Sequence, residues 1–158
     1  MRILLVAAVA VTALLGVQAA AGASSLHVSG TYAVTSLGEQ NCVPGDTPSI
    51  LRCRTTGFVS QYSGTLTGTS VVDFDEVIDC ESGRTYGQGT ETFRGSVARI
   101  GSGSLTWRIR FESRIDCTTF TLFNFSATSM IFSGTGDLAR TRGGIAFTLD
   151  DYSGTLSR

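Results

Sequence analysis

The sequence predicts an all-β protein: an eight-stranded antiparallel up-and-down barrel preceded by a cleavable signal peptide. The first reason is composition, with 19 glycines against 2 prolines and β-branched and aromatic residues at short intervals. The second is that apolar residues alternate with polar ones, and no long window shows the helical repeat of about 3.6 residues. The third is that short links join the alternating runs, so the strands can form a meander that closes and removes its free edges.

Residues 1–23 have the features of a signal peptide, which leaves residues 24–158 as one domain. A basic second residue is followed by an apolar run over 3–17, and small residues favour cleavage after Ala21 or Ala23. This run of about 15 residues is shorter than the roughly 20 that span a membrane, so an uncleaved anchor is the less favoured alternative. We therefore expect a secreted protein with no stable membrane insertion after cleavage.

The four cysteines agree with export. An even count in a secreted chain indicates two disulfides, and three connectivities are open. We favour Cys42 with Cys53, across a loop, and Cys80 with Cys117. In an up-and-down meander all four thiols lie at one rim, so the rim position alone does not select the pairing. The chain has no C-x-x-C spacing and a single histidine, His27, so we expect no metal site.

Four strands are expected in the first half of the domain, at Leu26–Leu37, Thr55–Thr67, Ser70–Cys80 and Tyr86–Arg99. Each shows the alternation of period two that is typical of a strand with one buried face. The faces that we assign inward carry, in order, Val28 and Tyr32, Phe58 and Tyr62, Phe74 and Ile78, and Phe93 and Val97.

The fifth expected strand, Leu105–Asp116, has the clearest alternation in the chain. Its apolar residues Leu105, Trp107, Ile109, Phe111 and Ile115 are separated by charged or polar residues. The sixth, Phe120–Phe132, is apolar on both faces. Such a strand is either covered on both sides or has an exposed apolar patch that suits self-association.

The last two expected strands, Gly144–Leu149 and Tyr152–Ser157, follow a glycine-rich corner. We interpret that corner as the turn at which the sheet closes. It holds one acid, Asp137, and two bases, Arg140 and Arg142. We expect a surface ion pair among them that fixes the turn.

Four segments resemble a known family when they are taken in order: YSGTLTG at 62–68, GTETFRGSV at 89–97, SLTW at 104–107 and SGTGDL at 133–138. They are similar to a family of uncharacterised bacterial proteins with the allene-oxide-cyclase-like barrel, and the last also resembles a turn of plant dirigent proteins. The resemblance covers residues 57–156 and implies the barrel fold. Its motifs are mainly glycine and apolar positions, and the catalytic residues of the plant cyclase have no assignable counterparts here.

The interior of such a barrel can hold one small ligand. We expect Tyr32, Phe74, Phe93, Trp107 and Phe111 to line it, because they lie on the inward faces. The chain implies no cofactor. Its net charge of −1 and the scatter of its arginines do not suggest nucleic-acid binding.

Two carboxylates, Glu76 and Glu91, share a face with apolar neighbours. A carboxylate in an apolar barrel has a raised pKa and can act as a general acid or base, here together with Tyr62. These three are the candidate catalytic residues. In the non-functional alternative, a β-bulge turns the acid toward water, or an arginine at the rim of the barrel pairs with it.

Three functions remain open. We favour a non-catalytic secreted barrel that binds a small apolar or amphipathic molecule in its lumen. One alternative is an enzyme of the cyclase or isomerase type that acts on a flexible apolar substrate. The other is a dirigent-like or self-associating structural protein, which would be a homo-oligomer. The single histidine and the missing G-x-S-x-G motif argue against a serine hydrolase.

Overall fold

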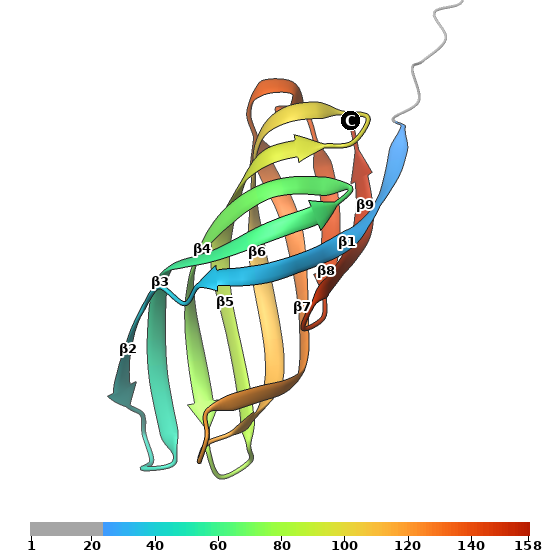
Figure 1. Cartoon of the computed structure of the whole chain (residues 1–158). Helices are drawn as coiled ribbons and strands as arrows, with labels where there is room; N and C mark the ends of the chain where they lie inside the picture. Colours follow the sequence, from blue (N-terminus) through green and yellow to red (C-terminus); the bar gives the residue numbers. More distant parts are fainter. Residues whose placement is uncertain (1–23) are drawn as a thin grey trace, which may run out of the picture.

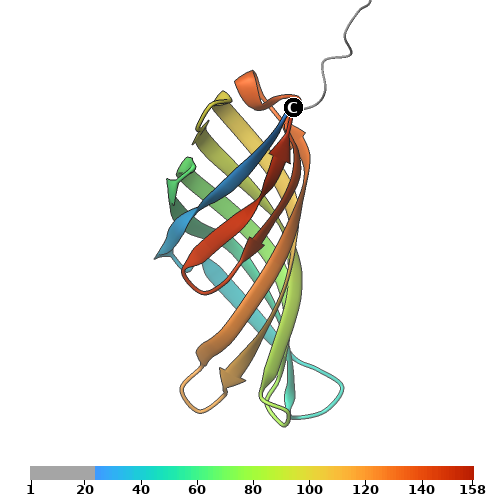
Figure 2. The same cartoon turned by 90° about the vertical axis from the view of Figure 1, so that its right-hand side faces the viewer.

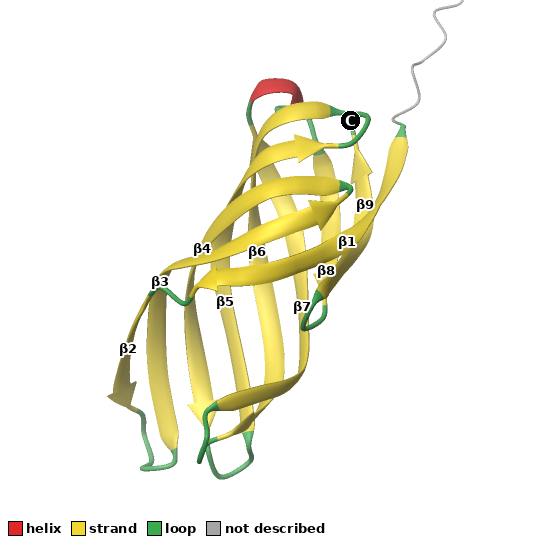
Figure 3. Ribbon diagram, in the orientation of Figure 1, coloured by secondary structure: helices red, strands yellow, loops and turns green. Residues whose placement is uncertain are grey.

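The computed structural model describes residues 24–158 (Figures 1 and 3). Most of this part is strand: β1 (Ser25–Ser36), β2 (Glu39–Pro44), β3 (Ile50–Gly64), β4 (Leu66–Asp79), β5 (Arg84–Val97), β6 (Gly101–Asp116), β7 (Thr121–Gly134), β8 (Arg142–Phe147) and β9 (Asp151–Ser157). A short 3-10 helix, η1 (Gly136–Leu138), lies between β7 and β8. Within residues 24–158, no helix is long and apolar enough to cross a membrane. The predicted signal peptide, 1–23, lies outside the described residues.

The nine strands form one antiparallel sheet in the order β1-β9-β8-β7-β6-β5-β4-β3-β2, and β1 also pairs with β3. The sheet therefore closes into a ring that uses every strand except β2. β1 pairs with the second half of β3, where Gly30 lies opposite Gly64, and β2 pairs with the first half. The all-β antiparallel prediction is confirmed, but the sheet has nine strands where the sequence predicted eight.

The additional strand is β2, within a region expected to be a loop. Residues 39–44 and 50–56 form a hairpin, in which Cys42 lies opposite Cys53 and is bonded to it. Every residue of β2 is exposed, so the segment has no hydrophobic alternation by which a strand could be predicted. Its extended backbone is set by pairing with β3, a tertiary contact that overrides weak local preference.

The β3–β4 turn is also displaced from the expected position. The sequence predicted a turn at 67–69, whereas the chain reverses at Gly64 and Thr65, and Gly68 lies inside β4. Gly64 has a φ of +108°, which favours glycine. A side chain there would also place its Cβ 2.7 Å from the Cα of Gly30 on the paired strand β1. The close approach of the β1 and β3 backbones therefore requires glycine at position 64 and places the turn there.

The glycine-rich corner after β7 is the turn that the sequence predicted, but its charges act differently. Gly136 begins η1 with a φ of +61°. The Asp137 carboxylate accepts a hydrogen bond from the backbone N–H of Ser102 at 3.0 Å. In the part of the chain that the structure describes, Asp137 forms no ion pair, so the expected contact with Arg140 or Arg142 is wrong. The corner lies at the end of the sheet that is at the top of Figure 1.

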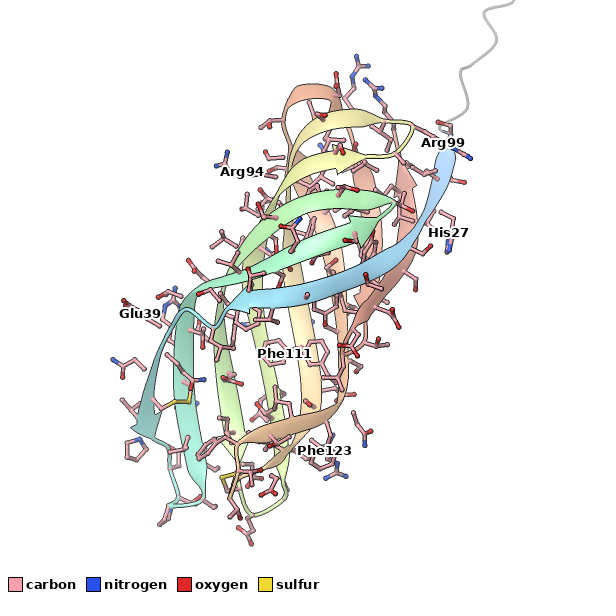
Figure 4. All side chains as sticks on the ribbon, viewed as in Figure 1. His27, Glu39, Arg94, Arg99, Phe111 and Phe123 are labelled. Carbon is pink, nitrogen blue, oxygen red and sulfur yellow. A yellow bond between two sulfur atoms is a disulfide. The ribbon has the colours of Figure 1, made fainter. Side chains whose placement is uncertain are left out.

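The buried side chains form two clusters at opposite ends of the closed sheet. The larger cluster fills the upper part and includes Leu66, Phe93, Leu105, Trp107 and Leu156, none of them exposed. The smaller one consists of Cys53, Ile78 and Ile115. The disulfides Cys42–Cys53 and Cys80–Cys117 lie at this lower end, and they are the pairing favoured from the sequence (Figure 4).

β7 changes face near its start. Leu122 and Phe125 both line the interior, although an odd spacing separates them, because Asn124 adopts a left-handed conformation with a φ of +55°. Met130 and Phe132 consequently point outward and are exposed, with the Arg108 guanidinium over the Phe132 ring. β7 is therefore apolar on both faces for two reasons: the change of face brings both Leu122 and Phe125 inward, and Met130 and Phe132 are exposed on the outside. Self-association through β7 stays a prediction.

Candidate functional site

An internal cavity of about 360 Å³ separates the two buried clusters. Its walls are mostly aromatic and aliphatic, and they are contributed by β1 to β8. The aromatic residues on the walls include Tyr32, Phe58, Phe74, Phe111, Phe125 and Phe147. Several of these rings contact each other edge to face; for example, the ring centroids of Phe74 and Phe111 are 5.4 Å apart. This packing holds the walls in place around an unfilled space.

The cavity opens through the lower side of the sheet. β7 pairs with β8 only over Ala127–Ile131, and β2 pairs only with β3. Among the described residues, two edges therefore have no neighbouring strand: the outer edge of β2, and the edge of the first half of β7 that faces away from β6. Figures 1 and 2 show that β1, β8 and β9 cover the upper part of the ring and leave the lower part open on one side.

Exposed apolar side chains surround this opening. Leu37 after β1 is 73% exposed, Phe120 before β7 is 59% exposed, and Leu149 in the β8–β9 turn is 49% exposed. All three also line the cavity, as do the partly exposed Val34 and Leu122. We call these five residues the apolar rim. Phe111 is visible behind the opening in Figure 4, between β1 and the start of β7.

Glu91 lies at the inner end of the cavity and is 4% exposed. Strand alternation on β5 points it inward, beside Phe93. Its Oε1 accepts a hydrogen bond from the Tyr62 hydroxyl at 2.8 Å, and its Oε2 accepts one from Trp107 Nε1 at 2.8 Å. Burial raises the pKa of Glu91, and hydrogen bonds from neighbouring side chains act in the opposite direction. Burial is the main cause that raises the pKa of Tyr62, and the charge of Glu91 adds to the rise.

Glu76 lies on the cavity wall nearer the disulfide end and is 9% exposed. Its Oε1 accepts a hydrogen bond from Gln40 Nε2 at 2.8 Å, and its Oε2 accepts one from the Thr85 hydroxyl at 3.1 Å. Burial raises the pKa of Glu76, and these two hydrogen bonds oppose the rise. Both acids therefore face the interior and take their protein hydrogen bonds from uncharged donors.

Tyr32 forms part of the wall between the mouth and Glu91. Its ring stacks on that of Tyr62, with centroids 5.8 Å apart, and its hydroxyl donates to the backbone carbonyl of Thr148. Burial raises the pKa of Tyr32 well above its ordinary value, and the charges of Glu91, Asp150 and Asp151 add to the rise.

The structure separates the predicted lining residues into two groups. Tyr32, Phe74 and Phe111 line the cavity, whereas Phe93 and Trp107 belong to the filled upper core and are fully buried. The three candidate catalytic residues, Glu76, Glu91 and Tyr62, all line the cavity, and a catalytic role for them stays a prediction.

Sequence reasoning missed Gln40 and Thr55. Gln40 lies on the strand that was expected to be a loop, so no pattern placed it near Glu76. Thr55 lies in β3, beside a register shift between Thr55 and Phe58. Its hydroxyl is buried and has no hydrogen-bond partner in the described part of the chain. Alternation alone places Thr55 on the outward face, because an odd spacing separates it from Phe58.

The fold is similar to that of a solved structure, a protein of unknown function from the DUF3224 family of Shewanella oneidensis MR-1. The TM-score is 0.62 with 12% sequence identity, and the match covers 84% of this chain and 96% of that one. No family model and no curated protein matches the sequence. Identity at this level shows a shared fold alone, so the function must be argued from the cavity.

Proposed function

We propose that this chain is an exported protein with an allene-oxide-cyclase-like β-barrel that binds a small apolar or amphipathic molecule in its cavity. The observation that carries the proposal is the continuity of the cavity with the apolar rim. Large apolar side chains that are exposed to water mark ligand grooves and interaction sites. Here they surround the entrance to a space whose walls have the same apolar character.

The size and lining of the cavity support this function. Ligand pockets have volumes of roughly 300–1,000 Å³, and they combine apolar walls with a few polar groups that orient the ligand. A volume of about 360 Å³ lies at the lower end of this range. The polar side chains on the walls are those of Tyr32, Gln40, Thr55, Ser60, Tyr62, Glu76 and Glu91. A small molecule with one polar end fits this arrangement better than a large ligand.

Export is supported by two observations. The two disulfides are typical of proteins in oxidising compartments. The sequence of residues 1–23 has the pattern of a signal peptide. A protein that binds apolar molecules outside the cell agrees with both.

An alternative function, catalysis of a cyclisation or isomerisation, is favoured by the Glu91–Tyr62 pair. A buried acid at the inner end of an apolar cavity could polarise a substrate whose conformations the walls restrict. Turnover that is lost in Glu91→Gln, with apolar binding retained, would support this alternative.

Binding is tested by titrating the mature protein with a neutral apolar fluorophore. Thr55→Phe extends a ring into the cavity, and Thr56→Phe is its matched control, because Thr56 is exposed on the opposite face of β3. We expect the wild type and Thr56→Phe to bind the fluorophore equally, and Thr55→Phe to bind it at least roughly tenfold more weakly. Equal binding by both variants, or no binding by the wild type, would contradict the proposed function.

A further inference from the structure

We propose that the ligand has a positively charged, hydrogen-bond-donating head on an apolar body, an amphiphilic amine, and that Glu76 is its counter-ion. This inference rests on the proposed function and names the ligand class for the same cavity. Three observations support it: the cavity lacks hydrogen-bond donors and cations for its two carboxylates, Glu76 is the less buried of the two acids, and aromatic rings lie beside Glu76.

The cavity contains more hydrogen-bond acceptors than donors. Each carboxylate has about four lone-pair sites, and Glu76 and Glu91 each accept two hydrogen bonds from side chains. The hydroxyls of Tyr32 and Tyr62 already donate, to a backbone carbonyl and to Glu91. The hydroxyls of Thr55 and Ser60 also line the cavity, but these two donors are fewer than the acceptor sites that the carboxylates leave open. An ammonium group provides three donors and no acceptor, so it matches the remaining sites, whereas a carboxylate head would add further acceptors.

No positive charge balances the two acids. Among the described residues, neither arginine nor histidine lines the cavity. The three ion pairs in this part of the chain are exposed; one of them joins Arg54 to Asp75 on the outer face. A buried carboxylate without a cation is costly to ionise, which agrees with the raised pKa of both acids, and a cation beside the carboxylate removes this cost. The missing partner is the head group of the ligand.

Glu76 is better placed for this role than Glu91. The carboxylate of Glu91 is more deeply buried, at the inner end of the cavity between Tyr62 and Trp107. Glu76 is the less buried acid, and its partner Gln40 lies on β2, the strand whose outer edge has no neighbour among the described residues. A head group at Glu76 therefore leaves the apolar body of the ligand between the aromatic walls and the apolar rim.

Aromatic rings flank Glu76. Phe74 lies two residues before it on the same face of β4. Gly87 is opposite Glu76 on β5, and the Phe111 ring covers Gly87 so closely that a Cβ there would meet its Cζ at 2.3 Å. An alkylammonium group next to a carboxylate and aromatic faces gains both ion pairing and cation–π attraction.

The test compares three probes of equal chain length, decylamine, decanol and decanoate, each displacing a neutral fluorophore from the mature protein. We expect the affinity to decrease in the order amine, alcohol, carboxylate, with roughly tenfold between the amine and the alcohol. Glu76→Gln should remove the preference for the amine and leave decanol binding unchanged. Glu81→Gln removes the same charge from the exposed β4–β5 turn and should change nothing.

The outcomes are distinguishable. If none of the three probes binds, the proposed function itself fails. If decanol binds but the amine binds no better, the inference fails alone. A preference that is lost in Glu91→Gln and kept in Glu76→Gln overturns the assignment to Glu76.

Discussion

The hydroxyl of Tyr62 donates a hydrogen bond to the carboxylate of Glu91 at 2.8 Å, where the two side chains are only 2% and 4% exposed. Tyr62 comes from β3 and Glu91 from β5, and β4 lies between these strands in the sheet. The bond therefore crosses the interior of the ring, at the boundary between the filled upper core and the cavity. The bond therefore both stabilises the fold and fixes the position of the Glu91 carboxylate in the cavity.

Tyr62→Phe should destabilise the protein by about 1–3 kcal/mol, because Glu91 loses a donor while it stays buried. The measurement is urea unfolding at neutral pH. Tyr86→Phe is the matched control, since Tyr86 is exposed and its hydroxyl makes no hydrogen bond within the described residues. An equal and small effect of both substitutions would show that the Tyr62–Glu91 bond contributes little.

Glu91→Gln should change how stability depends on pH. The pKa of Glu91 is raised by burial in the folded state, so its contribution to stability is fully present below the unfolded pKa of about 4.3 and is lost as pH rises through the folded pKa. The amide that replaces the carboxyl group can accept from Trp107 and donate to Tyr62 without ionising. The free energy of unfolding of the variant minus that of the wild type should therefore be more positive at pH 8 than at pH 4. Unfolding curves at both values measure this, and a pH-independent difference would contradict it.

The two disulfides should have separable roles. Each stabilises the fold by roughly 2–4 kcal/mol, and Cys80–Cys117 contributes more because it closes the longer loop, with a sequence separation of 37 against 11. Replacing Cys42 and Cys53 by serine should in addition weaken probe binding, because β2 carries Gln40 and borders the opening. Replacing Cys80 and Cys117 should lower stability alone. Urea unfolding and probe titration of both double variants test this, and the same loss of binding in both would show that β2 has no special role.

Gly136→Val should destabilise the protein without affecting ligand binding. Gly136 has a φ of +61°, a conformation that costs a β-branched residue more than roughly 1 kcal/mol. The corner lies at the end of the sheet opposite the disulfides, away from the opening. Ala139→Val, at an exposed neighbour with a φ of −56°, is the control. Thermal unfolding and probe titration are the measurements, and a variant of unchanged stability that had lost binding would refute this interpretation of the corner.

The strand pattern shows what could be predicted from sequence. Alternation in β6 placed Leu105, Trp107 and Ile109 in the interior, where the structure buries them. The inward positions of Tyr62, Glu76 and Glu91 follow from the same rule on β3, β4 and β5. Alternation reports which face a side chain occupies. It does not report how far along the interior the space is filled, so Trp107 and Phe111 had the same predicted role although only Phe111 borders the cavity.

By itself the sequence determined the all-β class and the inward faces of β4, β5 and β6, because these depend on local periodicity. It favoured the cysteine pairing that the structure has, but it left the other connectivities open. Only the tertiary structure decided that residues 39–44 form a strand, that β7 changes face at Asn124, and that the ring opens on its lower side. These features depend on which strands pair and where pairing stops, and contacts between distant segments determine that. The cavity lies where strand pairing stops on the lower side of the sheet, and Glu76 and Glu91 face it without a cationic partner among the described residues.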